Sequence, residues 1–178
     1  MIHYKEYSNN NSKREWITFV HGAGGSSAIW KKQIPYFSKA FNLLLVDLSG
    51  HGYSTSNLTQ NTNDKISFES ILNDVLEVLD NLNIKKSHFI GISLGTVIIN
   101  QLVLKEPKRI LKMVLGGATL ELNFMSRFMM YFAYATKSIV PYMWLYKLYA
   151  FIVMPSKTDR ESRKLFIKEA KRMNQREK

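Results

Sequence analysis

Four short runs of apolar residues, each about as long as a β-strand, are spread along the chain. They occupy residues 15–20 (EWITFV), 41–46 (FNLLLV), 87–92 (SHFIGI) and 110–115 (ILKMVL). The first two runs lead directly into glycine-rich segments, and short apolar runs bounded by such turn residues are typical of buried strands. We therefore expect four strands that lie inside a sheet.

The segments between these runs carry the apolar spacing of helices. Residues 68–82 place their apolar side chains on one helical face, and Ser67 stands where an N-cap belongs. Residues 94–106 predict a buried helix that ends before a proline. Residues 28–40 also have helical spacing, although Pro35 predicts a break or kink. This alternation predicts an α/β fold, a mostly parallel sheet with flanking helices and an active site at the carboxyl ends of its strands.

The pattern changes in the last part of the chain. Residues 124–155 are crowded with Met, Tyr, Phe and Trp and contain no strand-sized run, which predicts two or more helices that form a lid over an apolar pocket. The longest stretch without charge is short for a membrane span, and an element lying on a membrane surface is the alternative. We accordingly divide the chain into a core, residues 1–118, and a lid with a basic tail, residues 119–178.

The charge of the chain is strongly positive. It has 25 Lys and Arg against 14 Asp and Glu, a net charge of +11, and residues 157–178 are rich in these cations. Such a tail could attract nucleic acid or anionic lipid, but a solvated helix face explains it more simply. No zinc finger or aromatic RNA-binding motif accompanies it, so we expect no nucleic-acid partner.

The chain contains no cysteine. Disulfides, thiolate metal sites and a cysteine nucleophile are therefore excluded, and this composition fits a reducing compartment. Residues 1–12 are polar and lack the apolar stretch of a signal peptide. We expect a cytoplasmic protein.

One short motif carries nucleophilic chemistry. Residues Gly91 to Gly95 read G-x-S-x-G, with an apolar strand before the motif and an apolar helix after it. In a nucleophile elbow, the serine occupies a strained strand-to-helix turn where side chains at the two glycine positions would collide with neighbouring backbone. We therefore take Ser93 as the candidate nucleophile, and the alternative is an incidental turn.

A second glycine-rich segment, residues 21–25 (HGAGG), directly follows the first strand. Backbone N–H groups in such a loop can point into a cavity and stabilise the negative oxygen of a tetrahedral intermediate. We assign the two oxyanion-hole donors to the backbone amides of Ala23 and of Leu94, the residue after the serine. The alternative, a phosphate-binding loop, lacks both of the usual glycine motifs.

Several segments in this order resemble the α/β-hydrolase superfamily: EWITFVHGAGG, LLLVDLSGHGYS, HFIGISLGT and EPKRILKMVL. The resemblance covers residues 4–119 and is nearest to the lid-bearing branch of small esterases, C–C bond hydrolases, haloperoxidase-like proteins and menaquinone-pathway MenH-like enzymes. It implies that the strand before HGAGG lies beside the strand before Ser93. It also implies a supporting, structural role for His21, Gly22, Gly24 and residues 47–54.

The same resemblance implies a catalytic acid and then a histidine after the nucleophile, and this chain departs from that order. All four histidines precede Ser93. His88 begins the strand of the serine, at its far end, whereas His21 and His51 lie at the correct edge and leave a relocated base as an alternative. Asp159 is the only aspartate after the serine, and it lies in the charged tail. We therefore expect a truncated α/β-hydrolase fold without its C-terminal core strands, completed by a separate segment or by a homo-oligomer.

The expected function is that of a serine hydrolase that cleaves a small ester, thioester or related acyl substrate. The aromatic lid favours an apolar acyl group, and neither a metal nor an organic cofactor is needed for this chemistry. Without its acid and histidine, the 178-residue chain should be inactive or incomplete by itself. The alternative is a non-catalytic protein of the same fold that binds a small ligand.

Overall fold

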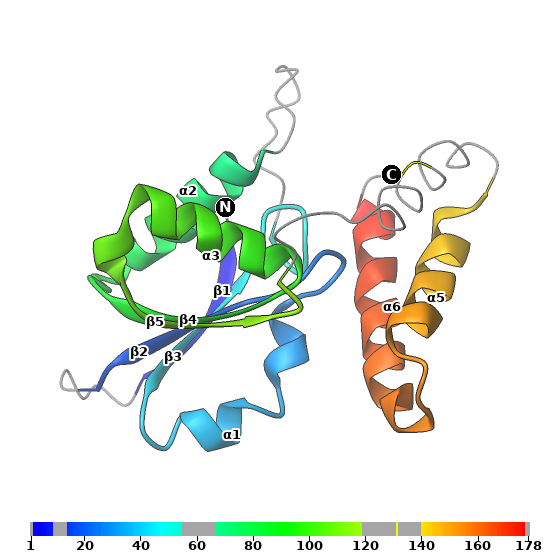
Figure 1. Cartoon of the computed structure of the whole chain (residues 1–178), viewed down its shortest axis with the longest axis horizontal. Helices are drawn as coiled ribbons and strands as arrows, with labels where there is room; N and C mark the ends of the chain where they lie inside the picture. Colours follow the sequence, from blue (N-terminus) through cyan, green and yellow to red (C-terminus); the bar gives the residue numbers. More distant parts are fainter. Residues whose placement is uncertain (1, 9–13, 55–66, 119–130, 132–139, 177–178) are drawn as a thin grey trace. The chain divides into compact units, whose positions relative to one another are not determined.

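The computed structural model divides the chain into two compact units, Met1–Ala118 and Thr119–Lys178, which are described separately below (Figure 1). The residues that the structure describes are 2–8, 14–54, 67–118, 131 and 140–176.

The first unit is built around a five-stranded sheet. Its strand order is β1-β3-β2-β4-β5, with β1 antiparallel to β3 and every other neighbouring pair parallel. The strands are β1 (His3–Tyr7), β2 (Trp16–Val20), β3 (Asn42–Asp47), β4 (Ser87–Ile92) and β5 (Ile110–Gly116). The four strands expected from apolar runs are all present, and the mostly parallel sheet with flanking helices is confirmed.

The first strand, β1, is a feature that the apolar pattern did not predict. Its sequence, HYKEY, has no buried residue, and four of its five positions are exposed. It is held by its ladder to β3, in which Tyr4 lies opposite Val46 and Glu6 lies opposite Leu44. A strand fixed by pairing with a buried neighbour needs little apolar pattern of its own, so its sequence gives no hydrophobic signal.

Alternating side chains of the central strands enter two separate clusters on the two faces of the sheet. On one face, Ile17 and Phe19 of β2 form a cluster with Leu43 and Leu45 of β3 and with Trp30. On the other face, Val20, Leu44 and Val46 join the buried side chains of the helices. Burial on both faces is what the continuous apolar runs of these strands require.

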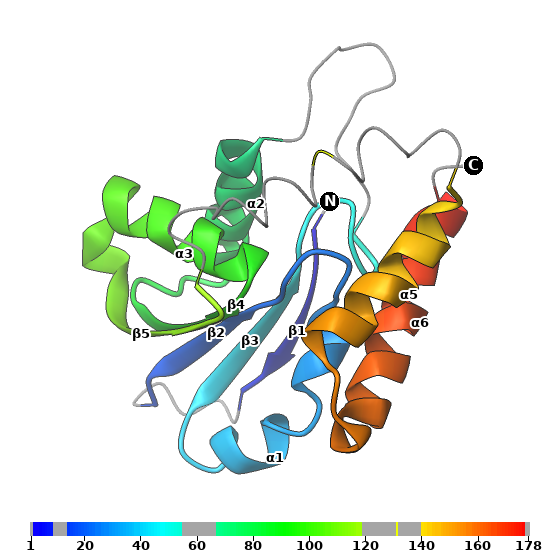
Figure 2. The same cartoon turned by 45° about the vertical axis from the view of Figure 1, so that its right-hand side comes forward.

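Helices cover both faces of the sheet (Figures 1 and 2). One face carries α2 (Phe68–Asn81) and α3 (Leu94–Lys105), and the other carries the short helices η1 (Ser27–Trp30) and α1 (Ile34–Phe37). The single-turn helix η2 (Pro107–Arg109) follows α3 and leads into β5.

The helix boundaries follow local sequence signals. Ser67 caps α2, because its hydroxyl accepts the N–H of Ser70 at 3.0 Å while the Ser70 hydroxyl binds the Ser67 N–H. Asn83, with φ of 55°, ends this helix in the left-handed conformation that asparagine tolerates. The segment 28–40 is split into η1 and α1, with Pro35 in the first turn of α1, so the break expected there is present.

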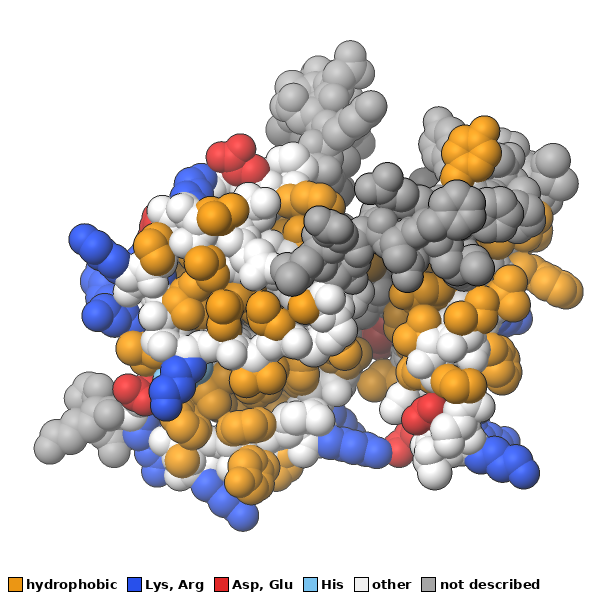
Figure 3. Space-filling view, in the orientation of Figure 1, with side chains coloured by type: hydrophobic (Ala, Val, Ile, Leu, Met, Phe, Trp, Pro, Cys, Tyr) orange, Lys and Arg blue, Asp and Glu red, His pale blue; other side chains and the backbone are white. Residues whose placement is uncertain are grey.

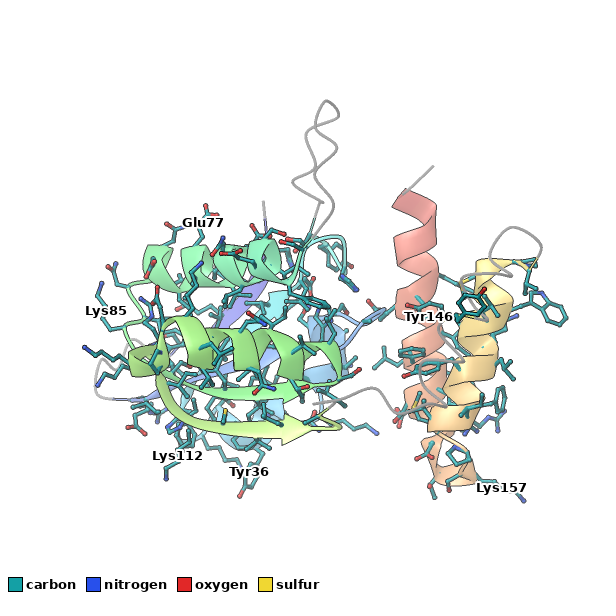
Figure 4. The ribbon with its side chains drawn as sticks, turned by 45° about the horizontal axis from the view of Figure 1, so that its top comes forward. Tyr36, Glu77, Lys85, Lys112, Tyr146 and Lys157 are labelled. Atoms are coloured by element: carbon teal, nitrogen blue, oxygen red, sulfur yellow. The ribbon has the colours of Figure 1, made fainter. Side chains whose placement is uncertain are left out.

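The second unit contains a pair of helices, α5 (Tyr142–Val153) and α6 (Arg160–Arg176), joined through η3 (Lys157–Asp159). Tyr146 of α5, labelled in Figure 4, stacks on Phe166 of α6 with ring centroids 5.5 Å apart. Ala150 of α5 and Ala170 of α6 are buried. Arg163 lies 4.9 Å over the ring of Phe151. These contacts hold the two helices against each other.

Other apolar side chains of α5 remain exposed, and Figure 3 shows hydrophobic side chains gathered along this helix. Trp144, Leu148, Phe151 and Ile152 recur at helical spacing and are each more than half exposed. None of the described helices is both long and apolar enough to cross a membrane. Much of the segment expected to form a lid, residues 124–155, lies outside the described residues, and its role as a lid stays a prediction.

A pair of leucines on α3 tests where the core lies. Leu102 is buried to 1% exposure and Leu104 is 79% exposed, although both belong to the same helix. Leu102→Ala should lower the free energy of unfolding by about 3 kcal/mol, because it leaves a cavity among packed side chains. Leu104→Ala should change it by less than about 0.5 kcal/mol. Urea denaturation followed by circular dichroism measures both, and equal effects would contradict this account of the core.

Candidate active site

Ser93 lies at the turn between β4 and α3, with a backbone conformation that side chains rarely adopt. Its φ is 51° and its ψ is −117°. The turn is held on both sides: the Ser93 N–H donates to the carbonyl of Gly116 at 3.0 Å, and the Ser93 carbonyl accepts the N–H and the hydroxyl of Thr96 at 2.8 and 2.6 Å. Strained backbone of this kind persists only where its surroundings fix it, and it is concentrated at functional sites.

The glycines on either side of Ser93 are required by close approaches. A Cβ atom at Gly95 would lie 2.3 Å from the carbonyl oxygen of Val20, and one at Gly91 would lie 2.5 Å from Cδ1 of Ile99. Both distances are far below van der Waals contact. The first turn of α3 is therefore packed directly on the carboxyl end of β2, as expected for a tight strand-to-helix turn.

The glycine-rich loop after β2 lies beside the serine. A Cβ atom at Gly22 would be 3.1 Å from Cβ of Ser93 and 3.8 Å from its Oγ. This proximity follows from the sheet, in which Val20 lies opposite Gly91 in the parallel ladder of β2 and β4. Ala23 belongs to this loop, and Leu94 opens α3, where the first N–H groups have no acceptor within the helix.

His21 links the glycine-rich loop to the end of β3. Its ring is fully buried, Nε2 accepts the N–H of Leu48 at 3.0 Å, and Nδ1 lies 2.7 Å from the carbonyl of Gly22. Since an N–H can only donate, Nε2 must be the unprotonated nitrogen and Nδ1 must carry the hydrogen. Burial, reinforced by the nearby His51 ring, lowers the pKa of His21 to about 4, so the ring is neutral near pH 7.

Asp47, at the carboxyl end of β3, joins the segments of Ser27 and Tyr53 to strand β1. One carboxylate oxygen accepts the N–H of Ser27 at 2.6 Å; the other accepts the N–H of Tyr53 at 3.0 Å and lies 2.9 Å from Nδ1 of His3. Burial alone would raise the pKa of Asp47, but the hydrogen bonds from Ser27 and Tyr53 outweigh it and lower the pKa. A Cβ atom at Gly52 would lie 2.3 Å from this carboxylate.

The resemblance implied only a general supporting role for residues 47–54, and the importance of Asp47 was missed. The available signal was an aspartate directly after a buried strand and before two closely spaced glycines. A buried carboxylate requires donors, and the tight turns that glycine permits can present backbone N–H groups to it.

The four histidines are held by partners other than Ser93. His3 pairs with Asp47, His88 lies 2.9 Å from a Glu15 carboxylate oxygen, and His51 has its Nδ1 3.0 Å from the Ser49 carbonyl. Burial lowers the pKa of His51. Within the described ranges, no hydrogen bond joins a histidine to the serine hydroxyl.

Asp159, the one aspartate that follows Ser93 in the sequence, has a local structural partner. It accepts the N–H of Ser156 at 3.1 Å and so caps η3 in the second unit.

Among the residues that the structure describes, no group of three or more His, Asp or Glu side chains is arranged to hold a metal ion.

A serine in a strained turn between a buried parallel strand and a helix, with a glycine-rich loop beside it, defines a recognisable class of α/β proteins. Residues 15–140 of the chain match the family described as the alpha/beta hydrolase fold. This match covers most of the chain, and the chain therefore belongs to the α/β-hydrolase fold family, as the resemblance of its motifs implied.

Two curated relatives are each similar to part of the chain. The protein named "Putative carbamate hydrolase RutD" of Stutzerimonas stutzeri is 30% identical to this chain over 113 residues. The match covers 64% of this chain and 41% of that relative. The 3-oxoadipate enol-lactonase 1 of Acinetobacter baylyi is 34% identical over 79 residues, covering 44% of this chain and 27% of that relative. The chain thus spans less than half the length of either relative.

A solved structure shows the same similarity. The enol-lactonase from Burkholderia xenovorans LB400 matches with a TM-score of 0.56 and 27% sequence identity. The match covers 63% of this chain and 41% of that chain.

The contact between α3 and β2 can be tested with two glycines. Gly95→Ala should lower the free energy of unfolding by roughly 1–3 kcal/mol, because the new methyl group meets the Val20 carbonyl and the helix must shift. Gly116→Ala is the matched control, since its nearest neighbour would be 3.5 Å away, an ordinary contact. Chemical denaturation of both variants is the measurement. A tolerated Gly95→Ala would mean that the helix does not lie on the strand.

The buried His21 predicts a pH dependence of stability. Its pKa is about 4 in the folded chain and 6.5 without perturbation, so the unfolded state takes up the proton first as the pH falls. The stabilisation is complete above pH 6.5 and decreases towards pH 4, by about 3 kcal/mol in total. Unfolding free energies measured from pH 4 to 7 should therefore rise less steeply in His21→Gln than in the wild type. Equal slopes would show that the ring titrates normally.

Proposed function

We propose that this chain carries the nucleophile and oxyanion hole of a serine hydrolase that acts on a small ester, thioester or related acyl substrate. The observation that carries the proposal is the position of Ser93, in a strained turn with the glycine-rich loop against it. The names of the relatives support the class of substrate, because a carbamate and an enol-lactone are both acyl compounds.

In the proposed reaction, Oγ of Ser93 attacks the carbonyl carbon of the substrate, and the carbonyl oxygen becomes an oxyanion. The N–H groups of Ala23 and Leu94 stabilise this oxyanion, each by about 3 kcal/mol. A base takes the proton of the Ser93 hydroxyl and gives it to the leaving group, which departs as the acyl-enzyme forms. Water, deprotonated by the same base, then attacks the acyl-enzyme, and the acid leaves as the serine recovers its proton. No metal or organic cofactor takes part in this scheme.

The base and the acid of this mechanism are proposed to come from outside the described site. Each of the four histidines has another partner, and all of them precede Ser93 in the sequence. A serine hydroxyl needs a base in hydrogen-bond reach to become a strong nucleophile. A separate C-terminal segment is the proposed source, because a second copy of the chain would bring only the same four histidines.

The surroundings of the reaction are part of the same proposal. An apolar, aromatic lid formed by residues 124–155 would favour an apolar acyl group, and the absence of cysteine supports a cytoplasmic location. The second candidate function is binding of a small ligand without turnover. It is favoured by the engagement of all four histidines elsewhere.

Hydrolysis of p-nitrophenyl acetate by the purified chain tests the proposal. We expect only a slow release of p-nitrophenolate, because an oxyanion hole without its full triad typically retains about 10³–10⁴-fold catalysis over water. Ser93→Ala should prevent acetylation of the chain at residue 93, whereas the part of the slow release that the oxyanion hole alone supports should remain. Ser162→Ala, at an exposed serine of α6, should leave acetylation of Ser93 unchanged.

Two results of this experiment would contradict the proposed function in different ways. A wild-type chain that p-nitrophenyl acetate acetylates at other residues but not at Ser93 would remove Ser93 as the nucleophile and leave the ligand-binding function. Fast turnover by the isolated chain that disappears in Ser93→Ala would show that a base is present within it. His51 would then be the first residue to replace, since it lies at the correct edge of the sheet beside His21.

A further inference from the structure

The carbonyl group of Gly22 is held by two donors at once. Nδ1–H of His21 donates to it at 2.7 Å, and the N–H of Gly25 donates to it at 3.1 Å. Two donors on one carbonyl fix the plane of the peptide group that contains it. The loop beside Ser93 therefore has one peptide plane with a defined orientation.

That peptide plane also contains the N–H of Ala23. No cis peptide bond occurs among the described residues, so the Gly22 carbonyl and the Ala23 N–H point in opposite directions. When the carbonyl is held towards His21 and Gly25, the Ala23 N–H must point away from both. Orienting the carbonyl is thus equivalent to orienting the amide.

The loop has little spare room around this arrangement. A Cβ atom at Gly25 would lie 3.1 Å from the Gly22 oxygen and 3.3 Å from Nδ1 of His21, where it would crowd both hydrogen bonds. Gly24 has φ of 73°, which bends the chain back so that the Gly25 N–H reaches the carbonyl. The glycines therefore permit the two donors to meet on one oxygen.

The other side of the His21 ring decides which nitrogen can donate. The Leu48 N–H occupies Nε2 at 3.0 Å and leaves the hydrogen on Nδ1, the nitrogen that faces Gly22. Leu48 directly follows Asp47, whose carboxylate holds the Ser27 and Tyr53 loops. The orientation of the peptide beside Ser93 is thus set from the end of β3.

We propose that His21 is a positioning residue of the oxyanion hole, which orients the Ala23 N–H by holding the Gly22 carbonyl through Nδ1–H. This inference rests on the proposed function for its chemical meaning. It goes further because it assigns the orientation of the Ala23 N–H to Nδ1 of His21. The Leu48 N–H, which binds Nε2, selects the tautomer that has its hydrogen on Nδ1.

Two substitutions of His21 distinguish the role of Nδ1 from the role of Nε2. The amide NH₂ of His21→Asn occupies nearly the place of Nδ1 and keeps a donor for the Gly22 carbonyl, while the contact with Leu48 is lost. The longer His21→Gln reaches the place of Nε2, where it keeps an acceptor for Leu48 and loses the donor to Gly22. Both side chains are polar and uncharged, so a general loss of packing affects the two variants alike.

The first measurement is the residual dipolar coupling of the Ala23 N–H bond in ¹⁵N-alanine-labelled full-length chain, because this coupling depends on the orientation of the bond. We expect the wild-type value in His21→Asn and a changed value in His21→Gln. The second is the rate at which p-nitrophenyl acetate acylates Ser93, followed by mass spectrometry. It should fall about 100-fold in His21→Gln, as when an oxyanion-hole donor is lost, and stay within about 3-fold of wild type in His21→Asn.

An Ala23 coupling that stays the same in both variants, or that changes equally in both, would overturn the proposal. If the variants do not fold, the wild type still tests it, because long-range ¹H–¹⁵N correlation spectra of the His21 ring must show the hydrogen on Nδ1. A hydrogen on Nε2 would overturn it. Absence of Ser93 acylation in the wild type, together with the expected couplings, would contradict the proposed function and leave the positioning intact.

Discussion

The amino end of α3 lies directly on the carboxyl end of β2, and this contact leaves no room for a side chain at Gly95. Because the helix starts there, the chain must turn sharply at Ser93, and the turn requires its positive φ. The same contact brings the serine beside Gly22, which continues from β2. The geometry of the candidate site therefore depends on one close approach between a helix and a strand.

A second set of interactions fixes the loops around this contact. Asp47 accepts N–H groups from Ser27 and Tyr53, and His21 connects Leu48 with the Gly22 carbonyl. Both side chains are buried and fully hydrogen-bonded, as burial of polar groups requires. The two connections tie the glycine-rich loop and the neighbouring turns to the carboxyl edge of the sheet.

The sequence allowed the central strands, α2 and the serine-bearing turn to be predicted, because each depends on a local signal. Continuous apolar runs mark strands that are buried on both faces. The G-x-S-x-G motif marks a turn in which the two glycine positions have no room for a side chain. Strand β1 could not be predicted in this way, since pairing with β3 holds it and its own residues are exposed. The buried Asp47 was missed for a related reason, because its carboxylate holds a distant segment, at Ser27, as well as the nearby N–H of Tyr53. The nucleophilic role of Ser93 and the lid stay predictions.

The most direct test of the account is to find where an activated ester reacts. The full chain would be treated with p-nitrophenyl acetate, digested, and mapped by tandem mass spectrometry over a series of times. The account predicts that the acetyl group appears on Ser93 faster than on any other serine of the chain. Acetylation of exposed serines at the same rate as Ser93, or ahead of it, would contradict the claim that this turn presents a nucleophile.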